Sequence, residues 1–125
     1  MTDEAVASDI KEFVLSRIDS VAQLEALLML RANPEELWDV AKMAERLYIT
    51  QRESYEVLTR LCAKGLLSKV GDAYRYAALP AELAIMVDRL SDAYAHHLIP
   101  VTNIIHRKLR RIHEFADAFK FKRKP

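Results

Sequence analysis

The chain of 125 residues contains only two glycines, Gly65 and Gly71, and their positions constrain its fold. Gly65 follows an amphipathic stretch, and glycine is the residue that most easily takes the left-handed conformation at a helix end. Gly71 and the aspartate after it separate two strand-like runs, 66–70 and 73–77, which is a signal for a two-residue hairpin turn. One glycine therefore predicts a helix stop, and the other predicts a hairpin tip.

Two capping signals precede the first glycine and divide that stretch into two helices. Asp39 is a favourable N-cap for a short helix over 40–47, because its carboxylate can accept from the free N–H groups of the first turn. Thr50 and Glu53 have the spacing of a capping box, in which each side chain binds the backbone of the other residue. The sequence predicts a second helix over 50–64, joined to the first by a two-residue turn.

Helix, turn, helix and hairpin in this order are typical of a winged helix-turn-helix. The predicted fold class is mainly α with a small β-hairpin wing, with helices at both ends flanking the core. The expected division is an N-terminal flanking helix over 1–18, the winged domain over 19–79, and a C-terminal helical dimerisation region with a basic tail over 80–125.

Residues 49–67 resemble the recognition helix and first wing strand of MarR-type bacterial transcriptional regulators. The shared pattern is a small polar cap, apolar positions along the helix and Leu-x-x-Lys-Gly-Leu-Leu over 61–67. The helix at 39–47 resembles the one that precedes it in that family, so the resemblance covers about residues 20–80. The hairpin departs from the family, because 71–75 reads Gly-Asp-Ala-Tyr-Arg instead of the family's Asp-x-Arg wing motif.

The resemblance implies a dimeric regulator that places the helix over 50–64 in the major groove of double-stranded DNA and the wing over 66–77 on the flanking backbone. The residues expected to contact DNA are Thr50, Gln51, Arg52, Tyr55, Glu56, Arg60, Lys69 and Arg75. Arginine suits guanine and glutamine suits adenine. The alternative is an ordinary solvated face, because 51–64 holds three bases and two acids.

Two helices are expected before residue 40. The first starts at Thr2 or Asp3 and runs to about residue 18, and the second starts near Ser20, where Gln23 completes another capping box. The segment 35–38 has two readings: the start of a helix that continues to residue 47, or a short strand beside the wing, which we favour.

Two further helices are expected after the wing, one from the Leu-Pro pair at 79–80 to about residue 98 and one over 101–119, with Pro100 as the break. Each carries a heptad-like apolar stripe: Leu83, Val87, Leu90, Tyr94 and His97 on the first, and Ile105, Leu109, Ile112, Ala116 and Phe119 on the second. The stripes favour a homodimer, and the alternative is a helical hairpin within one chain. Residues 120–125 are expected to fray.

The charge distribution is asymmetric although the net charge is only +1. Residues 1–50 hold ten acids and five bases, whereas 106–125 holds eight bases and two acids. Three partners suit the C-terminal bases: flanking DNA, the acidic N-terminal helix across a dimer, or solvent. We expect the cluster at 107–111 to pair with the N-terminal helix, and the bases at 120–124 to meet DNA or solvent.

No catalytic, cofactor or metal-binding pattern is recognisable, so we expect no enzyme activity. His96 and His97 are adjacent and diverge on a helix, which favours surface histidines over metal ligands. Cys62 is expected to be a buried structural thiol rather than a redox sensor, and Tyr74 and Tyr76 to pack in the hairpin rather than stack on bases.

No apolar run reaches the roughly 18 residues that a membrane span needs, and the single cysteine suits a reducing compartment. The sequence therefore predicts a cytoplasmic protein without a membrane partner. The rival to a DNA-binding regulator is a winged helix used only for protein–protein interaction. A small-molecule or protein effector is open in either case.

Overall fold

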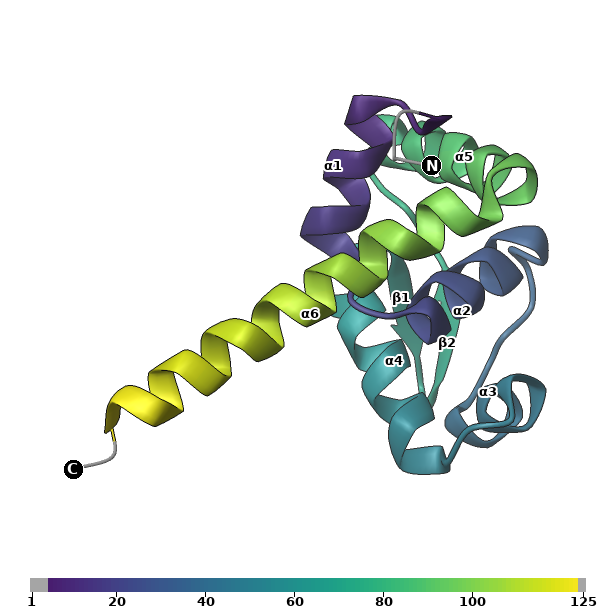
Figure 1. Cartoon of the computed structure of the whole chain (residues 1–125). Coiled ribbons are helices and arrows are strands. Elements are labelled where there is room, and N and C mark those ends of the chain that lie inside the picture. Colours follow the sequence, from purple (N-terminus) through teal and green to yellow (C-terminus); the bar gives the residue numbers. More distant parts are fainter. Residues whose placement is uncertain (1–4, 124–125) are drawn as a thin grey trace.

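The computed structural model describes the backbone of residues 5–123 and the side chains of residues 5–111. Within that part, the chain forms six helices and one two-stranded antiparallel sheet (Figure 1), which confirms the predicted class, mainly α with a small hairpin. The elements are α1 (Ser8–Arg17), α2 (Val21–Ala32), α3 (Val40–Leu47), α4 (Gln51–Ala63), β1 (Leu67–Val70), β2 (Ala73–Tyr76), α5 (Ala81–His96) and α6 (Leu98–Arg123).

Helices α3 and α4 begin where their caps predict. The Asp39 side chain accepts from the Lys42 N–H at 2.8 Å, and Thr50 accepts from the Glu53 N–H at 3.0 Å. The Glu53 carboxylate in turn accepts from the Thr50 N–H at 2.9 Å, which completes the capping box. Gly65 follows α4 with φ +81°, the left-handed conformation that its position predicts.

The hairpin pairs Leu67 with Tyr76 and Val70 with Ala73, and Gly71 takes φ +62° in its turn. A third segment joins it, because Trp38 forms an antiparallel bridge with Tyr74 through two N–H···O bonds of 2.8 Å. Of the two readings of 35–38, the extended one is therefore confirmed, as a single bridge.

The N-terminal helix starts later than predicted. Helix α1 begins at Ser8, and residues 5–7 are not part of it, while Thr2 and Asp3 lie outside the described residues. Ser20 caps α2 by accepting from the Gln23 N–H at 3.1 Å. The Gln23 side chain does not return to the cap; it accepts from the Asp19 N–H, so the predicted box is displaced by one residue.

The break between the last two helices falls at His97, and the prediction that Pro100 marks it is wrong. Pro100 lies in the first turn of α6, where proline is tolerated because those N–H groups have no partner within the helix. The predicted end at residue 119 is also short, since the α6 backbone stays helical to Arg123. The backbone of 120–123 is helical, the expected fraying of this end stays a prediction, and the last two residues lie outside the described part.

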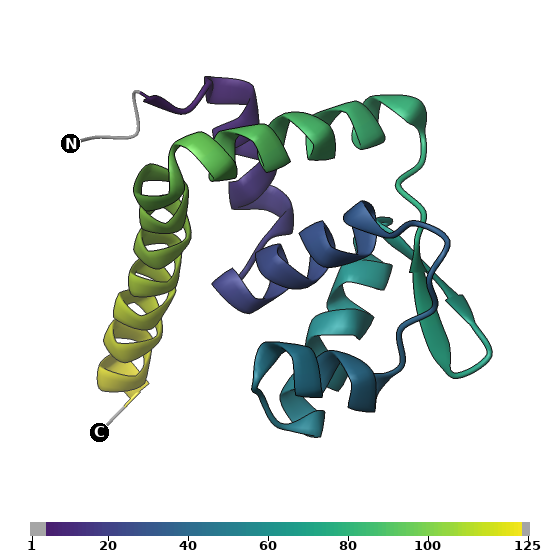
Figure 2. The ribbon, with the colours of Figure 1, turned by 90° about the vertical axis from the view of Figure 1, so that its right-hand side faces the viewer.

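One buried core runs through all three predicted segments. Helix α2 packs against α3, α4 and β2, whereas α1, α5 and α6 pack against one another. Figure 2 shows α5 crossing the top of the molecule and α6 descending along its left edge, with the hairpin at the right. The C-terminal part of α6 projects beyond the rest of the fold (Figure 1).

Among the residues whose side chains are described, most members of the two apolar stripes pack into this core. Val87 and Leu90 of α5 and Ile105 of α6 are fully buried, and Leu109 packs against the core at its edge. The His97 side chain, predicted to belong to the first stripe, is exposed. The side chains of Ile112, Ala116 and Phe119 lie outside the described part.

Candidate nucleic-acid interface

Helix α4 is held rigidly from behind, so that its outer face is presented to solvent. Ser54 is fully buried, and its hydroxyl donates to the Val40 carbonyl oxygen of α3 at 2.8 Å. Val57, Leu58 and Leu61 continue the same inner face into the core. The packing therefore fixes which side of α4 faces outward.

All eight predicted DNA-contact residues are exposed, but the structure does not bring them all onto one surface. Gln51, Arg52, Tyr55 and Glu56 lie next to one another on the first two turns of α4. The Arg52 and Glu56 side chains form an i, i+4 ion pair at 4.0 Å. Thr50 lies beside them and uses its hydroxyl as the helix cap.

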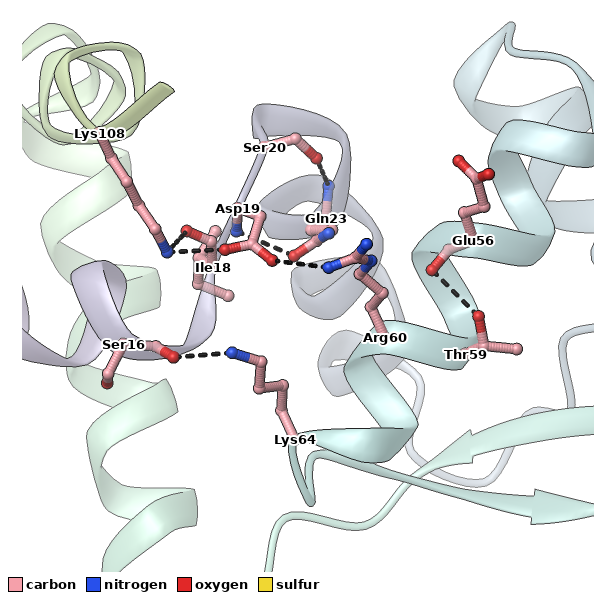
Figure 3. A network of polar contacts seen from close by, with 10 residues as sticks. All are labelled: Ser16, Ile18, Asp19, Ser20, Gln23, Glu56, Thr59, Arg60, Lys64 and Lys108. Atoms are coloured by element: carbon pink, nitrogen blue, oxygen red, sulfur yellow. Dashed lines mark hydrogen bonds and ion pairs between the residues drawn. The ribbon is translucent and has the colours of Figure 1, made fainter. Parts of the chain in front are cut away.

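Arg60 is directed away from that group. Its guanidinium lies 3.5 Å from the Asp19 carboxylate, in the connection between α1 and α2 (Figure 3). Glu56, one turn earlier, points away from this connection in the same view. The structure thus separates Arg60 from the N-terminal face of α4.

The two predicted wing contacts are also separated. In the hairpin register Lys69 lies opposite Tyr74, whereas Arg75 lies opposite Ser68. Successive pairs of an antiparallel hairpin lie on alternate faces, so Lys69 and Arg75 occupy opposite faces of the wing. The Lys69 ammonium lies 6.0 Å from the centre of the Tyr74 ring. A duplex on one face of the hairpin would meet only one of the two.

The α3–α4 turn exposes an aromatic residue that sequence reasoning missed. Tyr48 has φ +57° and its residue surface is 95% exposed. It follows α3 directly, and Tyr55 of α4 is 55% exposed. The sequence shows only that a tyrosine follows the helix at 40–47, in the predicted turn. The left-handed backbone of this residue, which is uncommon for a bulky side chain, is seen only in the structure.

Asp19 forms a second feature that the sequence did not reveal. It accepts from Lys108 of α6 at 2.7 Å and pairs with Arg60 of α4, so it connects two helices to the start of α2 (Figure 3). Lys108 also donates to the Ile18 carbonyl oxygen at 3.0 Å. The pKa of the Asp19 carboxyl is lowered, first because Lys108 donates a hydrogen bond to it. The positive charges of Lys108, Lys64 and Arg60 lower it further, against a partial loss of hydration.

The ends of α1 and α4 are also linked by two reciprocal contacts. The Arg17 side chain donates to the Lys64 carbonyl oxygen, and the Lys64 ammonium donates to the Ser16 carbonyl oxygen at 2.8 Å. These bonds satisfy backbone groups that helix ends leave without partners. They tie α4 to the N-terminal helix.

Of the four acidic residues expected to pair with the 107–111 cluster (Asp3, Glu4, Asp9 and Glu12), one is engaged elsewhere, and Glu12 forms no ion pair with any other described residue. Asp9 of α1 pairs with Arg89 of α5 in the same chain, and Lys108 is engaged by Asp19 rather than by the N-terminal helix of another copy. Asp3 and Glu4 lie outside the described residues. Pairing of this cluster across a dimer stays a prediction for Arg107, Arg110 and Arg111.

The described residues also bear on the expectations for metal binding, for the histidines, for Cys62 and for a membrane span. No group of three or more histidine, cysteine, aspartate or glutamate side chains among them could hold a metal ion. The His96 ring lies 2.9 Å from the Asp92 carbonyl oxygen. The Cys62 thiol is half-buried against the core, less than the buried thiol that the sequence predicts. Tyr74 is buried in the hairpin and Tyr76 packs partly buried against the core, as predicted. None of the helices, over the residues described, has the length and apolar character to cross a membrane.

Comparisons with protein-family models, with curated proteins and with solved structures found no match for this chain, so the candidate interface stands on its own geometry.

Proposed function

We propose that this chain is a winged helix-turn-helix regulator of transcription, similar to the MarR type, that binds specific sites on double-stranded DNA as a homodimer. Helix α4 would enter the major groove, and one face of the hairpin would lie along the flanking backbone. Such a protein acts in the bacterial cytoplasm, and the free thiol of Cys62 suits that compartment.

The observation that carries the proposal is the N-terminal face of α4, defined by Gln51, Arg52, Tyr55 and Glu56. Four exposed polar or aromatic side chains lie together at the start of a helix whose opposite face is locked to α3. Recognition helices read base edges with residues of this kind near their N-termini. A rigid scaffold is needed, because base contacts depend on accurate side-chain placement.

Arg52 provides the direct test. After selection of the best binding site from random DNA, Arg52→Ala should weaken binding to that site by about 1–3 kcal/mol, the usual value of a bidentate base contact. Arg31→Ala is the matched control, because Arg31 pairs with Asp88 on the α2 and α5 side of the fold. Equal affinity of the Arg52→Ala protein and the wild type on the selected site would rule out this contact.

The exposed residues at the start of α4 also favour a second function, in which the chain binds another protein and not DNA. Tyr48 and Tyr55 expose large aromatic area there, and aromatic residues are enriched in protein interfaces. The pairing of Arg52 with Glu56 also lowers the net charge that would attract DNA. A mobility-shift assay with random DNA at low salt separates the two functions, because absence of any shift would leave only the interaction module.

A further inference from the structure

The densest positive charge in the described part of the chain lies on α6, not on the proposed recognition helix. Four of the five positions from 107 to 111 are basic, and no acidic residue occurs between Leu98 and Arg111. Helix α6 as a whole holds seven bases and two acids, whereas α4 holds two bases and two acids.

Helix α1 adds to this positive surface. Lys11 of α1 lines a hollow of about 60 Å³ together with Arg107, Lys108 and Arg111 of α6. Ile104 and Ile105 are buried against the core, so the inner face of α6 is anchored and its arginines lie on the outer side. We call the face of α6 that carries the exposed Arg110 and Arg111 the α6 basic surface.

Lys108 is not counted in this surface, because its ammonium group is used to hold α6 against the connection that also binds α4. Lys108 and Arg60 bind the two oxygens of the same carboxylate, Asp19, at 2.7 and 3.5 Å (Figure 3). The basic turns of α6 and the second half of α4 therefore lie on either side of one aspartate. The α6 basic surface thus adjoins the second half of α4, beyond its N-terminal face.

The chemistry of the α6 basic surface fits a phosphate backbone. Guanidinium groups bind phosphate oxygens in a bidentate manner and remain charged at any physiological pH. Each phosphate that is neutralised releases condensed counterions, which gives affinity without dependence on sequence. This is the contribution that the nearly balanced charges of α4 do not supply.

From this arrangement we infer that the α6 basic surface binds the phosphate backbone of double-stranded DNA beside the segment contacted by α4. The inference rests on the proposed function and assigns to α6 the affinity of the complex, while α4 supplies its sequence preference. It gives the arginines at 107–111 a different partner from the acidic helix across a dimer that the sequence pattern predicts.

The test compares two charge-matched double variants. Arg110→Gln/Arg111→Gln removes two exposed charges from the α6 basic surface, and Arg31→Gln/Arg89→Gln removes two from α2 and α5. Binding to a random-sequence DNA duplex is measured by fluorescence anisotropy over a series of salt concentrations. The slope of log affinity against log salt should fall by about 1.8 for the α6 variant, at roughly 0.9 per phosphate contact, and stay unchanged for the control.

The outcomes separate this inference from the proposed function. If Arg52→Ala weakens binding to the selected site but the α6 variant keeps the wild-type salt slope, the α6 inference is overturned and the proposed function stands. If the α6 variant loses slope while Arg52→Ala changes nothing, the α6 surface binds DNA and α4 is not the reading helix. If the wild type does not bind DNA at low salt, both are wrong.

Two controls complete the experiment. Thermal unfolding followed by circular dichroism should give the same midpoint for wild type and α6 variant, because both arginines are exposed. Sedimentation with vesicles rich in anionic phospholipid tests whether the α6 basic surface binds a negatively charged membrane instead of DNA. Binding to vesicles that depends on Arg110 and Arg111, together with an unchanged DNA slope, would contradict the inference and assign the surface to membranes.

Discussion

At the scale of single residues, Asp19 links more of the molecule than any position that the sequence pattern singled out. Its carboxylate binds α6 through Lys108 and α4 through Arg60, and its backbone N–H is taken by Gln23 at the start of α2. The Lys108 side chain is only 15% exposed, so the Asp19 pair is screened less than the surface pairs of this chain. Asp19 therefore holds the C-terminal flanking helix α6 against α4.

Asp19→Asn should lower the free energy of unfolding at pH 7 by about 1–2 kcal/mol, because a hydrogen bond between charged groups is lost. The pKa of Asp19 is lowered in the folded chain from 3.8. The ionised Asp19 therefore contributes its full stabilisation at pH values above 3.8, its ordinary pKa. This contribution is lost as the pH falls through the lower pKa that Asp19 has in the folded chain. When the pH is lowered from 4, the free energy of unfolding, measured with urea, should fall less for the Asp19→Asn variant than for the wild type.

Asp9→Asn is the matched control, because Asp9 also has a lowered pKa, first through its hydrogen bond with Arg89, but lies exposed on the surface. Solvent screening should make its effect on stability smaller than that of Asp19→Asn. Equal effects of the two substitutions at pH 7 would show that Asp19 is only an ordinary surface partner.

At the scale of elements, the junction between α4 and β1 depends on one backbone conformation. Gly65 has φ +81°, and a Cβ built there would meet nothing within 4 Å. The demand for glycine therefore comes from the left-handed backbone itself rather than from crowding. This conformation turns the chain from the end of α4 into the wing.

Gly65→Val should destabilise the fold by about 1 kcal/mol or more, because a β-branched residue resists positive φ. Gly65→Asn should cost less, since asparagine enters this region more readily. Thermal unfolding of the three proteins checks the order, and a valine variant that melts with the wild type would refute it.

The elements that could be predicted from the sequence are those whose ends are fixed by local chemistry. Asp39, Thr50 and Gly65 each act within one turn of their own position, so α3, α4 and the start of the wing follow from neighbouring residues. Pro100 does not identify the break, because proline is tolerated in the first turn of a helix as well as at a break. The sequence alone gave no reason to prefer His97 for the break.

The candidate site was predictable in part for the same reason. Exposure of Gln51, Arg52, Tyr55 and Glu56 follows from the spacing of the buried residues on α4. The partner of Arg60 lies 41 residues away and that of Lys108 lies 89 residues away, and no local pattern connects them. The opposite faces of Lys69 and Arg75 follow only once the hairpin register is known.

At the scale of the whole molecule, the proposed homodimer needs a contact surface outside the buried core. The described parts of the α5 and α6 stripes are buried within the chain, so they are not free to pair two protomers. Large apolar side chains are still exposed where α5 gives way to α6, with Leu98 at 48% and Ile99 at 63%. Ile85 of α5 is 58% exposed. These exposed apolar side chains are the ones that the proposed homodimer could bury.

Light scattering at tens of micromolar protein should therefore give twice the mass of one chain. Ile85→Glu/Ile99→Glu should shift the protein towards monomer, because a buried unpaired charge is costly at an interface. Leu37→Glu is the control, since Leu37 is exposed beside the wing and far along the chain from these helices. A monomeric wild type would refute the dimer and leave intrachain packing as the role of the described parts of both stripes.

The bridge between Trp38 and Tyr74 gives the protein an optical reporter of its own. Trp38 is the only tryptophan of the chain, is 1% exposed, and carries the Lys42 ammonium at 4.4 Å and the Arg46 guanidinium at 5.4 Å from its ring. Its indole fluorescence thus comes from one place, where the segment before α3 meets the wing. A change in emission wavelength or intensity would report separation of the wing from α3, without any label attached to the protein.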